Sequence, residues 1–134
     1  MTPADLDLAR RLAAVPGIWR AGMVTTCRLR VIEASGGGLL GWTPGATRDG
    51  GGWLDTDTTD GMGLTPDLDN AATRGALLEV AREMWGRPDL HACPMFSLHT
   101  GALTGWRVAI DEHTAHYALT EGAAIALTIL AAPR

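Results

Sequence analysis

The sequence contains no lysine, and all eleven of its basic residues are arginine. Acidic residues number 15, which leaves a net charge of −4. Basic side chains that neutralise phosphates supply most of the affinity of proteins for nucleic acid. A chain without a basic excess is therefore not expected to bind nucleic acid directly.

Cysteine is also scarce, with Cys27 and Cys93 the only two in the chain. Two cysteines are too few for a disulfide-stapled scaffold, and 134 residues can bury a core without one. The most apolar stretch, residues 123–132, is too short to span a bilayer. The first residues lack a signal-peptide pattern. We expect one soluble cytoplasmic domain over residues 1–134.

The motifs that most often mark enzymes are absent as well. The sequence has no G-x-S-x-G nucleophile motif, no Walker motif and no G-x-G-x-x-G dinucleotide loop. Ser35 and Ser97 stand outside any motif. We therefore predict a protein without catalytic activity and without a cofactor.

Three helices are predicted from their end signals. Thr2 can cap a helix that begins at Pro3, and Pro16-Gly17 ends it. Asp69 or Asn70 can cap a second helix over Ala71–Trp85, which Gly86 and Pro88 end, and Gly75 inside it suggests close packing against a strand. Thr120 can cap a buried apolar helix over Glu121–Ala132.

Strands are predicted from alternating apolar and polar residues. The clearest is Ala21–Ile32, and the others are Leu39–Trp42, Trp53-Leu54, His91–Leu98, residues 106–110 and Ala115–Leu119. The element order is α-β-β-β-α-β-β-β-α. This order predicts an α+β fold with a mainly antiparallel sheet and about three helices.

The segment from Trp53 to Asn70 holds five aspartates and no basic residue. Its D-x-D start resembles a calcium loop, but Pro66 stands where the bidentate glutamate should be. Asp67 and Asp69 can serve the following helix N-terminus. Asp55, Asp57 and Asp60, with Asp67, are predicted to dock on a basic protein surface, while a solvated connection is the alternative.

Two other groups of residues contain side chains that could form a binding site. Zinc could in principle use His91, Cys93, His113 and His116, but no pair has a zinc spacing, so no metal is predicted. A small ligand with a phosphate and a base could use Arg28, Arg30, Trp42 and Trp53.

The stretch Thr65–Leu90 resembles a segment of small bacteriophage and prophage proteins. The shared features are Pro66-Asp67-Leu68, Ala72-Thr73-Arg74-Gly75, Leu77-Leu78 and Arg82-Glu83-Met84-Trp85-Gly86. The resemblance covers about half of the chain and carries no known activity. It implies an origin on a mobile element and a place of action in the host cell cytoplasm.

The hypothesis that follows is a non-enzymatic binding protein, such as an anti-defence inhibitor that docks its acidic loop on a basic host protein. One alternative is an oligomeric binder that sequesters a nucleotide signal, and another is a structural phage accessory protein. A homo-oligomer is compatible with each of these.

Overall fold

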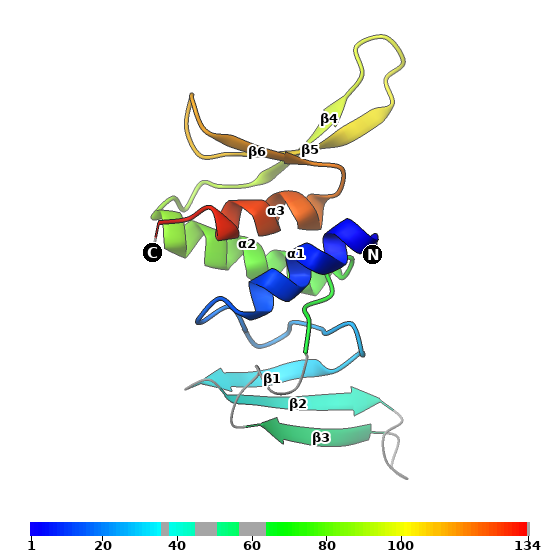
Figure 1. Ribbon diagram of the computed structural model, residues 1–134, viewed down its shortest axis with the longest axis vertical. Helices are drawn as coiled ribbons and strands as arrows, with labels where there is room; N and C mark the ends of the chain where they lie inside the picture. The colour runs from blue at the N-terminus through cyan, green and yellow to red at the C-terminus, as the bar shows by residue number, and fades with distance from the viewer. Residues whose placement is uncertain (36–37, 45–50, 57–63, 134) are drawn as a thin grey trace. The chain divides into compact units, whose positions relative to one another are not determined.

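The computed structural model describes residues 1–35, 38–44, 51–56 and 64–133, and describes side chains over residues 1–32 and 64–133 (Figure 1). Its elements are α1 (Pro3–Ala13), β1 (Arg30–Ser35), β2 (Gly38–Pro44), β3 (Gly51–Thr56), α2 (Ala71–Trp85), β4 (Ala92–Phe96), β5 (Leu103–Ala109), β6 (Ala115–Ala118) and α3 (Glu121–Leu130). The predicted α+β class, the three helices and the element order are confirmed.

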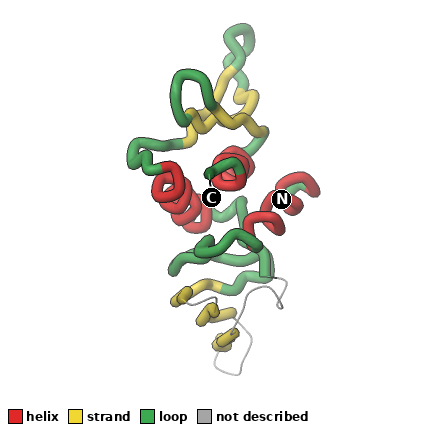
Figure 2. Tube along the Cα trace, turned by 60° about the vertical axis from the view of Figure 1, so that its left-hand side comes forward, coloured by secondary structure: helices red, strands yellow, loops and turns green. Residues whose placement is uncertain are grey.

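The strands form two antiparallel sheets instead of the one that the sequence suggested. One has the order β1-β2-β3 and the other β4-β5-β6, each a meander of strands that are neighbours in the chain. The strands of both sheets are yellow in Figure 2. The chain divides into two compact units, an N-terminal unit, Met1–Ala76, and a C-terminal unit, Leu77–Arg134. The single domain expected over residues 1–134 stays a prediction.

The strand predicted over Ala21–Ile32 is wrong in its first part, because β1 begins only at Arg30. Before it, the chain reverses in a tight turn. The N–H of Arg28 donates to the carbonyl of Thr25, and the N–H of Thr25 donates to the carbonyl of Leu29, each at 2.9 Å. Arg28 has a φ of +69°, the left-handed residue that commonly follows a turn in a three-residue hairpin loop.

The reversal left the alternating pattern intact, which is why the sequence did not reveal it. Met23 and Thr25 before the turn are buried, and so are Leu29 and Val31 after it. Cys27 lies in the turn and is exposed. The N–H of Val31 donates to the carbonyl of Met23 at 2.8 Å, so the two arms pair with each other.

The predicted caps of α1 and α3 are confirmed. The Thr2 hydroxyl accepts a hydrogen bond from the N–H of Asp5 at 3.1 Å. The Thr120 hydroxyl accepts one from the N–H of Ala123 at 3.2 Å. Each cap satisfies a backbone donor that the first turn of a helix leaves without a partner.

Asp69 and Asn70 were the two residues predicted as possible caps of α2. The side chain of Asn70 accepts a hydrogen bond from the N–H of Thr73 at 3.1 Å. The buried Thr73 hydroxyl then accepts from the N–H of Val24 at 2.9 Å and donates to the carbonyl of Val24 at 3.1 Å. These two bonds join the start of α2 to the arm that precedes the Thr25 turn.

The expectation that Gly75 marks a close approach is wrong. Apart from the backbone of its own helix and its chain neighbours, no atom of the described residues would lie within 4 Å of a Cβ placed there. The close approach is at Gly105 in β5, where a Cβ would lie 2.8 Å from the carbonyl oxygen of Ala118.

In the C-terminal unit, α3 packs against all three strands of the β4-β5-β6 sheet (Figure 1). Its predicted burial is confirmed, with seven buried residues: Gly122, Ala123, Ala124, Ile125, Ala126, Thr128 and Ile129. The indole N–H of Trp85 donates to the carbonyl of Thr128 at 2.9 Å. This bond satisfies one of the carbonyls that the last turn of a helix leaves without an intrahelical donor.

Among the described residues, no helix is both long enough and apolar enough to cross a membrane.

Candidate interaction surface

The β4-β5-β6 sheet has two unlike faces. Val108 is opposite Ala92 and His116 in the register, and it is completely buried. The ring centroids of His116 and Trp85 lie 6.5 Å apart, and the indole N–H of Trp85 donates a hydrogen bond to a carbonyl of α3. Residues opposite one another in an antiparallel pair share a face. This face, the covered face, is therefore the one against α3.

The other face carries the row Cys93, Arg107 and Tyr117. Phe96 pairs with Leu103 at the end of the β4–β5 hairpin, beyond a register shift between Met95 and Phe96. Such a shift interrupts the alternation of side chains between the two faces. We call this side of the sheet, together with the end of the β4–β5 hairpin, the open face, because five large apolar side chains in these places are exposed. Their exposed fractions are 58% for Phe96, 101% for Leu98, 52% for Leu103, 57% for Tyr117 and 83% for Leu119.

The turn at the end of the β4–β5 hairpin is closed by hydrogen bonds. The Ser97 hydroxyl accepts from the N–H groups of His99 and Thr100 at 3.2 and 3.3 Å, and the N–H of Ser97 donates to the carbonyl of Ala102 at 2.8 Å. Gly101, with a φ of +71°, completes the turn. The hydrogen bonds hold Leu98 at the tip in contact with water, although the side chain is apolar.

The turn between β5 and β6 is built by one carboxylate. Asp111 accepts from the N–H groups of His113 and Thr114, each at 2.8 Å. The hydrogen bond from the N–H of His113 is the main reason that the pKa of Asp111 is lowered, since it favours the charged form. These hydrogen bonds close the turn that joins β5 to β6.

The covered face also holds a buried polar atom. Nε2 of His116 is buried and has no hydrogen-bond partner within the part of the chain that the structure describes. The tilted ring of Trp85 is its aromatic neighbour. A buried polar atom without a partner reduces stability. The burial of Nε2 therefore offsets part of the stabilisation that packing of the His116 ring provides.

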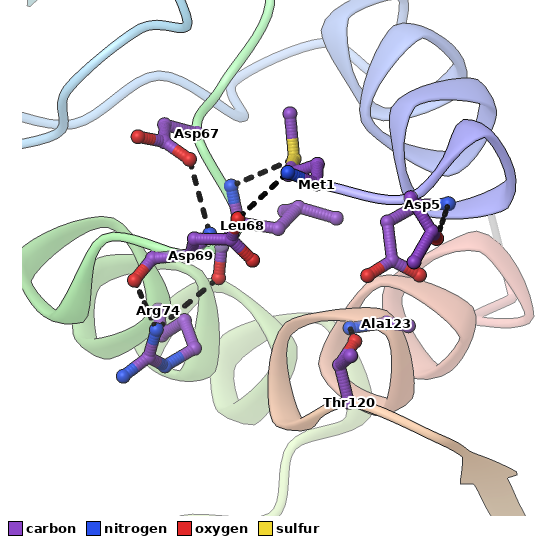
Figure 3. Close-up of polar contacts among 9 residues, drawn as sticks. Met1, Asp5, Asp67, Leu68, Asp69, Arg74, Thr120 and Ala123 are labelled. Carbon is purple, nitrogen blue, oxygen red and sulfur yellow. Dashed lines mark hydrogen bonds and ion pairs between the residues drawn. The ribbon is translucent and has the colours of Figure 1, made fainter.

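The described end of the acidic segment is used within the N-terminal unit (Figure 3). Asp67 accepts from the N–H of Asp69 at 3.1 Å, and the Asp69 carboxylate lies 2.9 Å from the amine of Met1. That carboxylate, through its hydrogen bond and its charge, raises the pKa of the amine. Arg74 donates to the carbonyl of Asp69 at 2.6 Å. The structure thus gives Asp67 and Asp69 roles in the local fold.

The other three aspartates of the predicted docking surface have no described side chains. Asp57 and Asp60 lie outside the described residues, and for Asp55 only the backbone in β3 is described. Docking of this segment on a basic partner stays a prediction.

The four residues of the predicted ligand site fall in the N-terminal unit. Arg30 is opposite Trp42 in the register, and Trp42 is opposite Trp53, so three of the four occupy one row across β1, β2 and β3. Arg28 is exposed in the turn that precedes β1. The side chains of the two tryptophans are outside the described part of the structure.

The described side chains give no metal centre. No three histidine, cysteine or acidic side chains among them lie close enough to hold an ion. Cys93 is half-buried on the open face, whereas His116 lies on the covered face. The sheet therefore separates two of the four residues that were weighed as zinc ligands.

Sequence reasoning missed the open face. The alternation in β5 indicates that Val108 is buried and Arg107 is exposed to solvent, and a solvent-exposed face is expected to be polar. The available signal was the apolar character of residues out of phase with the core, Leu103 and Tyr117, and of Leu98 and Leu119 beside the strands.

The chain matched no protein-family model, no curated protein and no solved structure.

Proposed function

We propose that the chain is a non-enzymatic binding protein whose protein-contact surface is the open face of the β4-β5-β6 sheet. The supporting observation is that five large apolar side chains of the sheet, its hairpin end and the residue after β6 are exposed: Phe96, Leu98, Leu103, Tyr117 and Leu119. Single exposed apolar residues are ordinary, but a contiguous group is typical of an interaction site.

The ordering of the hairpin supports the same function. Holding apolar groups in water has no benefit for the isolated fold. The hydrogen-bonded turn at Ser97 nevertheless fixes the strand ends that carry Phe96 and Leu103. A surface that is rigid before it binds loses less conformational entropy on binding.

The test compares two baits immobilised from the full chain and exposed to lysate of a bacterial host. In the first bait, Leu103→Ser and Tyr117→Ser remove two of the five exposed apolar side chains of the open face. In the control, Ile32→Ser removes an exposed apolar side chain from the N-terminal unit. We expect the first bait to capture at least tenfold less host protein than the wild-type chain captures. The control bait should capture as much as the wild-type chain. Equal capture by the two baits would contradict the proposal.

A second candidate function is favoured by the register of the first sheet. The row of Arg30, Trp42 and Trp53 brings together residue types that suit a phosphate and a base. A thermal-shift screen against nucleotides tests it. We expect one member to raise the melting temperature of the wild-type chain, and Arg30→Gln but not Arg107→Gln to abolish the rise. A flat response across the library would count against nucleotide binding.

The origin on a mobile element and the anti-defence role stay predictions. Binding through the acidic segment is tested separately, by replacing Asp55, Asp57 and Asp60 with asparagine. Salt-sensitive binding that these changes weaken would support it. Because the open face is apolar, contacts made there are expected to persist at high salt.

A further inference from the structure

We infer that the partner protein contributes an extended segment, which adds as a fourth strand to the β4-β5-β6 sheet along the side of β6 that lies away from β5. We call this side of β6 the β6 edge. The inference rests on the proposed function, because it names how the partner of that surface is held. It follows from the direction of the hydrogen bonds in β6 and from the contrast between the two edges of the sheet.

Every second residue of β6 directs its backbone polar groups away from β5. The N–H of Ile110 donates to the carbonyl of Thr114 at 2.8 Å, so these two opposite residues form a hydrogen-bonded pair. Hydrogen-bonded and non-hydrogen-bonded pairs alternate along an antiparallel ladder. His116 is therefore hydrogen-bonded to β5, whereas Ala115 and Tyr117 belong to non-hydrogen-bonded pairs. The N–H and C=O groups of Ala115 and Tyr117 point outward, along the β6 edge.

The chemistry of this edge specifies the kind of occupant. Within the part of the chain that the structure describes, β5 is the one strand that pairs with β6. A row of alternating outward N–H and C=O groups is a template for the backbone of another extended segment. Such strand addition is a recurrent way in which proteins recognise peptides, with the backbone supplying affinity and alternate side chains supplying specificity.

The opposite edge of the sheet is closed to a further strand. Arg107 does not bond to β6, so its backbone groups point toward Cys93 in β4. The next residue, Pro94, stands where a backbone N–H would point outward, and proline has none. A register shift between Met95 and Phe96 follows. Proline and such shifts are devices that keep edge strands from pairing, and the ladder of β6 has neither.

The side chains beside the β6 edge suit an apolar segment. Tyr117 is on the open face and is more than half exposed, and Leu119, one residue after β6, is exposed as well. No residue from 115 to 120 is acidic or basic. A neighbouring strand with an apolar residue opposite Tyr117 would form the kind of cross-strand pair that stabilises sheets. Because β6 has only four residues, these side-chain contacts must add to the backbone hydrogen bonds.

The probe is a phage-displayed library of random peptides of about 12 residues, panned against the full chain. Fluorescence anisotropy then gives the Kd of the enriched peptides. Ala115→Pro copies onto β6 the device that Pro94 provides in β4, and the first residue of a strand tolerates proline. It should raise the Kd about tenfold or more, because it removes an outward N–H. The matched control, Ala115→Ser, retains that N–H and should leave the Kd within about twofold.

Amide hydrogen exchange, followed by NMR on the wild-type chain, tests the same contact without a substitution. We expect the amides of Ala115 and Tyr117 to exchange rapidly in the free chain, because they do not donate to β5, and about tenfold more slowly with peptide bound. The amide of His116, which already donates to β5, should change less. Rapid exchange of both outward amides in the complex would overturn the inference, and so would a library that yields no binding peptide.

Two further outcomes identify other occupants. Slow exchange of the outward amides in the chain alone, lost on dilution, would assign the β6 edge to a second copy and overturn the inference. The proposed function fails separately, since Ala115→Pro leaves Leu103 and Tyr117 in place. If capture of a host protein survives Ala115→Pro but is lost with Leu103→Ser and Tyr117→Ser, the binding surface stands and only the strand addition is wrong.

Discussion

The two faces of the β4-β5-β6 sheet belong to the same three strands, yet one is buried and the other is in water. On the covered face, Val108 is excluded from solvent and α3 packs along the strands. On the open face, Leu103 and Tyr117 are each more than half exposed. Both faces carry apolar residues, so composition does not separate them. What separates them is the position of the helix.

The difference shows that apolar character along a strand specifies burial without specifying the partner that provides it. A helix can cover one face of a three-stranded sheet, and the other face then requires another surface. In the described C-terminal unit that second surface is absent. The covered face should therefore govern the free energy of unfolding, and the open face should govern association.

The largest expected effect is on the covered side, from Ile129→Ala in α3. Ile129 is completely buried, and truncating a buried isoleucine to alanine removes packing and leaves a cavity, at a cost of about 2–5 kcal/mol. Urea unfolding measures the change. Leu119→Ala, a similar truncation on the open face, should change the free energy of unfolding by about 0.5 kcal/mol or less. Similar losses from both would abolish the distinction between the faces.

The next effect concerns the close approach of β5 and β6. Gly105→Ala should destabilise the chain by about 1–3 kcal/mol, because the added Cβ would lie 2.8 Å from the backbone oxygen of Ala118. The control is Gly75→Ala in α2, where the added methyl has no neighbour within 4 Å. That control should stabilise the helix by up to about 1 kcal/mol. Changes of the same sign in both variants would contradict the assigned geometry.

A smaller effect is expected where α2 supports α3. Trp85→Phe keeps an aromatic ring but removes the N–H that donates to the carbonyl of Thr128. Loss of this hydrogen bond should cost about 0.5–1.5 kcal/mol. Trp106→Phe, at a half-buried site on the covered face, is the control for the change in ring size. Equal losses in the two variants would show that ring size, and not the hydrogen bond, matters.

The smallest effect is a pH dependence at the turn that joins β5 to β6. The pKa of Asp111 is lowered in the folded chain, chiefly by the hydrogen bond from the N–H of His113. A carboxyl with a lowered pKa stabilises the fold above its unfolded pKa of about 3.9 and loses that contribution as the pH falls through the folded value.

Asp111→Asn retains an acceptor oxygen without the charge. The melting temperature of the wild-type chain should exceed that of this variant by more at pH 7 than at pH 3. A difference that is the same at both values would show that the charge on Asp111 does not stabilise the turn.

Local signals predicted much of the fold because they act within a few residues. The caps at Thr2 and Thr120 and the bounds Ala71–Trp85 depend on hydrogen bonds and backbone preferences inside one turn of helix. The reversal at Arg28 escaped prediction, since a three-residue loop preserves the alternation of buried residues on either side of it. The close packing expected at Gly75 was wrong because a glycine in a helical sequence does not indicate whether another element lies beside it.

The sites were harder to predict than the elements. The row of Arg30, Trp42 and Trp53 was proposed from residue types, and only strand register shows that the three positions are aligned. The role of the Asp69 carboxylate within the N-terminal unit depends on a contact with Met1, which is far away in the sequence. No local pattern encodes such a contact.

The sequence by itself determined the order of helices and strands, the first residue of each helix and the residues able to form a core, because these follow from propensity and periodicity along the chain. The last helix was expected to reach Ala132, but α3 ends at Leu130. Tertiary structure alone decided that the strands form two sheets, that α3 covers one face of the second, and that Leu103 and Tyr117 remain exposed. The physical reason is that burial requires two surfaces, and a sequence pattern describes only one of them.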